Sequence, residues 1–177
     1  MKLPEVEINH VRFRVLPNRY AILFMIWYSS GSSMQIHRLP LMTYISSHII
    51  RYEYELSPII SEALINDVSK LINEGFLEFL SANNRFIVKV TEEGRRIIGE
   101  MYSMSNEYVV FGDYLIIRLK DLLNELMRIV NAYQDLNTPT LLSIALRELS
   151  IKERDLISKV LMDLSFNLRN PCENRLG

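Results

Sequence analysis

The chain has 177 residues, of which 49% are hydrophobic and 23% charged, and its formal net charge is −1 at pH 7. This composition excludes an intrinsically disordered chain, and the length fits one ordinary domain or a small domain with a helical extension. The single cysteine, Cys172, excludes an internal disulfide and favours a cytoplasmic location.

The N-terminal segment predicts no signal peptide and one strand. Pro4, Glu5 and Glu7 stand where a signal peptide would have a basic and then an apolar run. Further on, Arg12 and Arg14 alternate with three apolar residues. This period of two is typical of a strand, and it places both arginines on the open face.

Two short helices are expected next. Pro17-Asn18 opens the apolar segment 20–28, which at nine residues is too short to cross a bilayer, so no membrane partner is expected. The Ser-Ser-Gly-Ser-Ser run at 29–33 ends this first helical segment. Residues 39–49, with Pro40 in the first turn, fit a second helix. Residues 50–56 then alternate between apolar and charged. Either the second helix continues to about Tyr52, or an extra strand lies here.

The segment 57–74 predicts an amphipathic helix. Ser57 followed by Pro58 is a favourable N-cap and first helical residue, and Gly75 supplies a left-handed C-terminal residue. Apolar residues at three- and four-residue spacing form one buried face: Ile60, Leu64, Val68, Leu71 and Ile72.

A hairpin and another helix follow. The runs 76–80 and 85–90 are rich in aromatic and β-branched residues, and 81–84 supplies turn formers between them. Thr91 then caps a helix whose first turn holds Glu92 and Glu93, where the helix dipole favours acids.

This order of a helix, a hairpin and a capped helix resembles the recognition helix and wing of MarR- and PadR-like winged-helix regulators. The resemblance lies in residues 64–77, the Asn-Asn-Arg turn and the Val90-Thr91-Glu92-Glu93-Gly94-Arg95 helix start. It covers roughly a quarter of the chain. It implies a DNA-binding regulator in which the 58–74 helix enters the major groove and the 82–87 hairpin tip contacts the backbone or minor groove.

After Ser103 the sequence predicts helices only. Steps of four and three residues define an apolar stripe that suits a helix in a bundle or dimer. We assign this stripe to dimerisation: Leu115, Leu119, Leu122, Leu126, Ile129 and Tyr133. Thr138-Pro139 starts a further helix, and Ser150 with Glu153 forms a capping box for a third. A three-helix bundle within one chain is the alternative to a homodimer.

These elements predict a mainly α fold with a small β-hairpin, that is, a winged helix-turn-helix with a helical C-terminal extension. The expected domains are residues 1–104, with the N-terminal strand and the winged helix, and residues 105–177, which form the bundle or the dimerisation region.

Enzyme chemistry finds little support in the sequence, and no cofactor is expected. The three histidines form no metal-binding pair at helical spacing, and no zinc motif is present. The six glycines are scattered and do not form a phosphate-binding loop. The acidic pairs Glu53/Glu55 and Glu92/Glu93 fit a solvated face and a helix start better than an acid–base pair.

Double-stranded DNA is therefore the first predicted partner. Asparagine and lysine read base edges, and serine and basic residues hold phosphates. The predicted contact residues on the helix and wing are Ser61, Asn66, Ser69, Lys70, Asn73, Asn83, Asn84, Arg85, Lys89 and Arg95.

The charges weigh against this partner. Residues 56–104 hold five Lys/Arg and seven Asp/Glu, whereas phosphate neutralisation supplies most non-specific DNA affinity. The alternative function is a winged-helix scaffold subunit of a chromosome-organising or transcription complex, in which the acidic helix contacts another protein. The discriminating feature is whether Arg85, Lys89, Arg95 and the Arg12/Arg14 pair share one surface.

Overall fold

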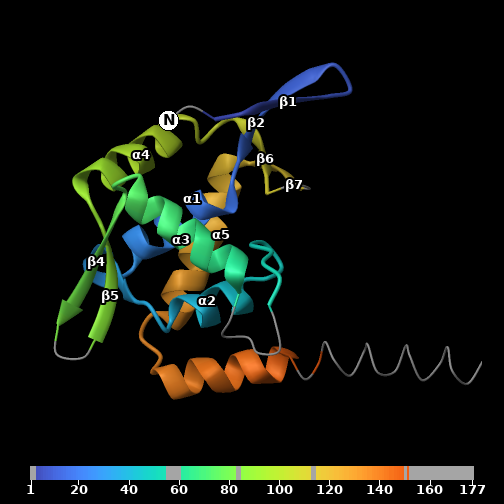
Figure 1. Cartoon of the computed structure of the whole chain (residues 1–177). Helices are drawn as coiled ribbons and strands as arrows, with labels where there is room; N and C mark the ends of the chain where they lie inside the picture. The colour runs from blue at the N-terminus through green and yellow to red at the C-terminus, as the bar shows by residue number, and fades with distance from the viewer. Residues whose placement is uncertain (1–2, 55–60, 83–84, 113–114, 150, 152–177) are drawn as a thin grey trace, which may run out of the picture.

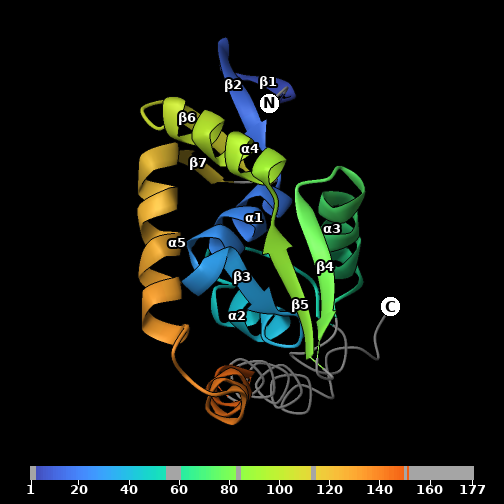
Figure 2. The same ribbon diagram turned by 90° about the vertical axis from the view of Figure 1, so that its left-hand side faces the viewer.

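The computed structural model describes residues 3–54, 61–82, 85–112, 115–149 and 151. About half of these residues are helical and nearly a quarter lie in strands. The elements in chain order (Figures 1 and 2) are β1 (Glu5–Ile8), β2 (Val11–Leu16), α1 (Asn18–Tyr28), the 3₁₀ turn η1 (Ser30–Ser32), β3 (Ser33–Gln35), α2 (Leu39–Ile45), α3 (Glu62–Asn73), β4 (Leu77–Ala82), β5 (Arg85–Val90), α4 (Glu92–Ser103), β6 (Tyr108–Phe111), β7 (Leu115–Arg118) and α5 (Leu119–Tyr133). Residues 138–149 are also helical.

The strands form two sheets. β3, β5 and β4 make a three-stranded antiparallel sheet in that order, and its β4–β5 hairpin lies at one side of the molecule (Figure 1). The second sheet has the order β1-β2-β6-β7, in which β2 and β6 run parallel and the other pairs run antiparallel. The β1–β2 hairpin projects from the opposite end of the molecule (Figures 1 and 2).

Helix α1 is the centre of the core. Its residues 20–26 are all buried, because a helix that is apolar on every side must be covered on every side. It lies between α3 and α5 and contacts both of them (Figure 2). The amphipathic helices α3, α4 and α5 each turn one apolar face toward the core, and their polar faces remain exposed.

Local hydrogen bonds explain how α3 passes into the hairpin. Gly75 has a φ of 77° and donates to the Ile72 carbonyl, while Phe76 donates to the Leu71 carbonyl. These two bonds make a Schellman motif, which satisfies the last carbonyls of α3. The predicted helix end at Gly75 is confirmed.

The start of α4 is fastened to the same turn. Thr91 caps α4 by accepting from the Gly94 amide at 3.1 Å, and its hydroxyl donates to the Gly75 carbonyl at 2.6 Å. A Cβ atom on Gly94 would lie 2.3 Å from the Phe76 carbonyl oxygen. Thr91 and Gly94 of the Thr-Glu-Glu-Gly sequence are therefore the residues that allow α4 to pack closely on the α3–β4 turn.

The prediction of a mainly α fold with a small β-hairpin is wrong, because the protein is mixed α/β with a four-stranded and a three-stranded sheet. The strand predicted around Arg12 and Arg14 is confirmed as β2, and the predicted hairpin as β4–β5. The sequence reading missed β1, β3, β6 and β7. Each of them has only three or four residues, which is too short for a clear period.

The joint between α2 and α3 also differs from expectation. Helix α2 ends at Ile45, and residues 51–54 are neither helix nor strand. Their alternation has another cause: Tyr52 and Tyr54 turn inward against α3 and α2, while Arg51 and Glu53 are exposed. Helix α3 begins at Glu62, because Ser61 is extended and acts as the N-cap. The predicted cap at Ser57 and Pro58 lies outside the described residues.

A single core extends across residue 104, the predicted domain boundary. Strand β6 pairs with β2, and α5 packs on α1, so elements from both sides of the boundary share a sheet and a hydrophobic cluster. Leu115 lies in β7, and Tyr133 is half-buried against the core. The other four residues of the predicted dimerisation stripe are buried within one chain: Leu119, Leu122, Leu126 and Ile129. A dimer would have to use other surfaces.

Candidate nucleic-acid interface

Helix α3 presents a narrow polar stripe to solvent. Leu64, Val68 and Leu71 are buried on its inner face. The residues on the opposite face are spaced by four, three and four positions, which keeps them in line along the helix. This outer stripe consists of Glu62, Asn66, Ser69 and Asn73, and Lys70 is exposed beside it. The two amides, the hydroxyl and the ammonium group can each donate a hydrogen bond to a base edge or a phosphate. The amides and the hydroxyl can also accept one from a base edge.

Ser61 does not belong to this stripe. Its side chain is only 1% exposed, and its hydroxyl accepts a hydrogen bond from the Leu64 amide. The expectation that Ser61 lies on the exposed side of the helix is therefore wrong. Its role is to satisfy one of the amides that have no partner at the start of a helix.

Two acidic residues of α3 lie at its flanks and have partners. Asp67 is half-buried, accepts a hydrogen bond from the Tyr52 hydroxyl at 2.8 Å, and lies 3.8 Å from the Lys70 ammonium group. Burial and the neighbouring Asp67 carboxylate raise the pKa of Tyr52, so its hydroxyl stays protonated and donates. Glu74 lies 3.6 Å from the Arg19 guanidinium group. Glu62 is the acid that remains on the outer stripe.

The wing, defined here as the β4–β5 hairpin, carries one exposed arginine and one paired lysine. Arg85 is exposed at the start of β5. Lys89 lies directly opposite Glu78 in the ladder, and the two charged groups are 3.3 Å apart. Asn83 and Asn84 lie outside the described residues.

The basic residues of α4 are held by acids on the same helix. Arg95 donates to Glu92 at 2.7 Å, and Arg96 donates to Glu93 and Glu100. The guanidinium of Arg96 lowers the pKa of the Glu93 carboxyl, mainly through their hydrogen bond. These pairs are exposed, and exposed ion pairs are weak, so a phosphate can compete for the arginines.

The basic groups predicted for DNA do not all share one surface of the chain. Arg12 and Arg14 lie on the β1–β2 hairpin, at the opposite end of the molecule from the tip of the wing (Figures 1 and 2). Their charged groups face Glu7 and Glu107 respectively. The N-terminal arginines therefore do not share a surface with the tip of the wing, so the condition that all these basic residues lie on one surface is not met.

An apolar groove runs beside the outer stripe of α3. It has a volume of about 250 Å³, and Ser69 supplies its polar lining atoms. The rings of Phe79 and Phe86 stack at the wing with centroids 5.7 Å apart, and both rings are about half exposed. Phe79 lines the groove, whereas Phe86 lies beyond its lining. The other lining residues come from the β3–α2 turn, α2 and α3: Ile36, Leu39, Pro40, Leu64, Ile65, Val68 and Ile72. The sequence reading missed this groove.

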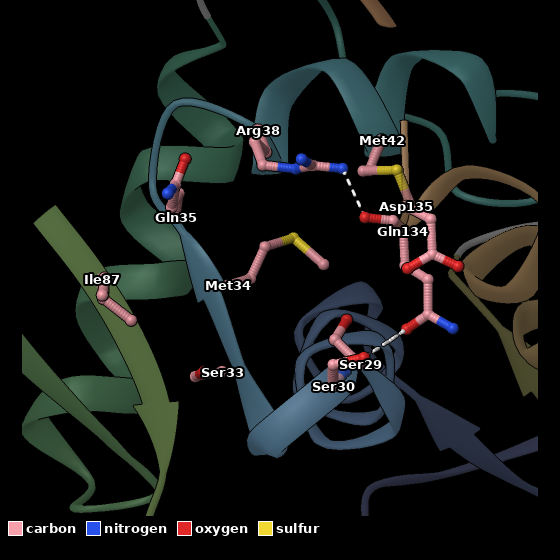
Figure 3. Close-up of a pocket in the computed structure, with 10 residues that line it drawn as sticks. All are labelled: Ser29, Ser30, Ser33, Met34, Gln35, Arg38, Met42, Ile87, Gln134 and Asp135. Carbon is pink, nitrogen blue, oxygen red and sulfur yellow. Dashed lines mark hydrogen bonds between the residues drawn. The ribbon is translucent and has the colours of Figure 1, made fainter. Parts of the chain in front are cut away.

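A more polar cavity of about 270 Å³ lies where β3 and α2 meet the end of α5 (Figure 3). Arg38 donates to the carbonyls of Tyr133 and Gln134, the last ones of α5, and Ser30 donates to the Gln134 side chain. A cation at the C-terminal end of a helix is favoured by its dipole. The cavity thus lies within a joint that fastens the end of α5 to η1 and to the start of α2, the segments on either side of β3.

Within the described residues, no group of three or more His, Cys, Asp or Glu side chains is placed to hold a metal ion. No described helix has the length and apolar character needed to cross a membrane.

No protein-family profile, curated protein or solved structure matches the chain. The assignment of function therefore rests on the geometry of α3, the wing and the groove between them.

Proposed function

We propose that this protein binds double-stranded DNA, with α3 lying in the major groove and the wing beside it on the backbone or in the minor groove. The observation that carries the proposal is the outer stripe of α3. It presents Asn66, Ser69 and Asn73 in line, whereas Asp67 and Glu74 are turned to the flanks and partnered.

The order of the elements supports the same reading. The succession α1-β3-α2-α3-β4-β5, with a sheet ordered β3-β5-β4, is similar to the order of elements in winged helices, and this likeness supports the proposal. It agrees with the resemblance of residues 64–95 to MarR- and PadR-like regulators, and a transcriptional regulator is the role that fits best. Residues 46–61 separate α2 from α3, which is longer than the three or four residues of a compact helix-turn-helix.

The negative net charge of residues 56–104 opposes DNA binding less than the sequence alone suggests. Asp67 and Glu74 each lie within 4.0 Å of a basic group, which offsets part of their field at the outer stripe. In this proposal four basic residues contact the phosphate backbone of a duplex docked on α3 and the wing: Lys70, Arg85, Lys89 and Arg95. Those that form ion pairs within the chain can exchange a weak pair for a phosphate.

The experiment is a selection of bound sequences from a random duplex pool, followed by titration of selected and random duplexes. Asn66→Ala should weaken binding to the selected duplex by roughly 10- to 100-fold and leave the random duplex unchanged, because a base contact contributes about 1–3 kcal/mol. Arg85→Ala with Lys89→Ala should weaken both and reduce the salt slope by about 2.

Arg128→Ala is the matched control, since Arg128 is an exposed, acid-paired arginine on α5. It should bind both duplexes as the wild type does. Equal binding of all variants to both duplexes would remove α3 and the wing from the proposal.

The groove favours a second candidate function, a scaffold that binds another protein. Ile65, Phe79 and Phe86 place exposed apolar surface beside α3, and exposed apolar patches commonly mark protein contacts. Phe79→Ser with Phe86→Ser discriminates the two functions, because it removes apolar surface without changing charge. Loss of a co-purifying protein with unchanged duplex binding would favour the scaffold.

A further inference from the structure

The four-stranded sheet has one face that takes no part in the core. Directly opposed residues share a face, and the register pairs Ile8 with Val11, Val15 with Val110, and Val110 with Ile116. The outer sheet face, as we call it, therefore carries Val6, Ile8, Val11, Phe13, Val15, Tyr108, Val110, Ile116 and Arg118. Eight of these nine side chains are uncharged, and seven are aliphatic or Phe.

The other face of the same sheet is the one that meets the core. Leu16, Val109 and Phe111 belong to the main hydrophobic cluster and are fully buried. Val110 is buried as well, but it lies outside that cluster, which agrees with its place on the outer sheet face. On the β1–β2 hairpin the core side is charged, with Arg12 and Arg14 on β2. The hairpin thus turns its polar side toward the molecule and its apolar side away from it.

Much of the outer sheet face is exposed in the described part of the chain, although Val110 is buried and Phe13 and Val15 are half-buried. Val11 is 52% exposed, Tyr108 58% and Ile116 45%. They lie on three different strands, so the exposed surface extends across the sheet. A two-stranded hairpin is marginally stable in water unless its apolar face is covered, yet β1–β2 projects from the body (Figures 1 and 2).

We propose that a second copy of this chain covers the outer sheet face, so that the two sheets pack face to face. The composition favours a homodimer, because non-obligate contacts between different proteins are about as polar as the rest of the surface, whereas homodimer interfaces are more apolar. Two twisted sheets of the same hand also stack readily, with their strands about 30° apart.

The charges permit a second copy and disfavour one alternative geometry. Arg118 is the one charged residue on the face, and its guanidinium lies over the Tyr108 ring at the β7 end. The chain has a net charge of −1, so two copies approach without strong repulsion. Pairing of β1 with β1 of the partner is disfavoured, because it would place Glu5 and Glu7 against the same residues of the other copy.

The area of the outer sheet face limits how stable the dimer can be. Four strands about 4.8 Å apart, each roughly four to six residues long at about 3.4 Å per residue, cover roughly 300–400 Å². Two copies then bury roughly 600–800 Å², below the about 1,200 Å² at which stable interfaces begin. The dimer is therefore weak and concentration-dependent. It does not depend on the proposed DNA function.

Sedimentation velocity of the full chain from about 1 to 200 μM tests this proposal. The wild type should shift from monomer to dimer in that range, and Val11→Glu or Ile116→Glu should raise the midpoint at least tenfold. Leu146→Glu is the matched control, because Leu146 is similarly exposed, at 48%, on the helix of residues 138–149. It should dimerise as the wild type does.

Far-UV circular dichroism shows whether each variant folds. If a glutamate variant does not fold, Tyr108→Ser takes its place, because Tyr108 is exposed. A wild type that stays monomeric at 200 μM overturns the proposal. A dimerisation midpoint that rises equally in Leu146→Glu and in the sheet variants also overturns it. Duplex binding is measured separately on the monomer, so failure of the dimer and failure of DNA binding give different results.

Discussion

Gly94→Ala and Gly99→Ala form a matched pair, because both glycines lie in α4 and only one of them is in close contact. A Cβ at position 94 would lie 2.3 Å from the Phe76 carbonyl oxygen and 2.8 Å from a Val90 methyl carbon. At position 99 nothing lies within 4 Å. The two substitutions therefore give the same gain in helix propensity and differ in packing.

The expected effects have opposite signs. Gly99→Ala should stabilise the protein by about 0.5–1 kcal/mol, the usual advantage of Ala over Gly in a helix. Gly94→Ala gains the same propensity, but the carbonyl must move by about 1 Å, and overpacking of this kind costs about 1–3 kcal/mol or more. The net effect at position 94 is destabilisation by up to about 2 kcal/mol.

Urea unfolding followed by circular dichroism measures both variants. The free energy of unfolding should differ between them by about 1–3 kcal/mol, with Gly99→Ala the more stable. Because Thr91 caps α4 at the same turn, Gly94→Ala should also loosen the start of α4. Equal stability of the two variants would refute the close packing of α4 on the α3–β4 turn.

Three further predictions concern stability. Leu126→Ala should cost about 2–5 kcal/mol, because Leu126 is fully buried in one chain, and a loss below about 1 kcal/mol in urea unfolding would contradict that burial. Arg38→Met should cost about 1–3 kcal/mol by leaving two α5 carbonyls without their donor, with Arg38→Lys in between; thermal unfolding of the three proteins checks the order. Tyr52→Phe should flatten the alkaline loss of stability. The folded pKa of Tyr52 is raised above the unfolded value of about 10, so this tyrosine stabilises the fold below pH 10 and loses that contribution as the pH rises further. An unchanged pH profile of stability between pH 9 and 11 would contradict this assignment.

Local patterns in the sequence were sufficient to predict the α3–wing–α4 segment. Gly75, the hairpin and the Thr91 cap depend on residues only a few positions apart, and all three are confirmed. Local spacing also produced a wrong prediction at Leu115. It continues the helical spacing of Leu119 and later residues, but it lies in β7. Pairing of β6 with β2 joins residues about 95 positions apart, which no local period records.

The candidate site was predictable in part. The exposed positions of Asn66 and Asn73 followed from helical spacing. The Lys89–Glu78 pair did not follow from the predicted turn, because a turn at 81–84 would place Glu78 opposite Ile87, whereas Ala82 pairs with Arg85 and Glu78 with Lys89. The contact between Tyr52 and Asp67 was not predictable either, because it depends on the path of residues 46–54, which form no regular element that a sequence pattern would mark.

The most direct test of the central claim is fluorescence anisotropy of the wild-type protein with a pool of random duplexes at about 50 and 200 mM salt. Each phosphate contact lowers the affinity by about 3.5-fold over that range, so four contacts should lower it by roughly a hundredfold. This steep loss is the expected result for α3 and the wing on DNA. An absence of binding at 50 mM salt, or an affinity that does not change with salt, would contradict the DNA-binding function.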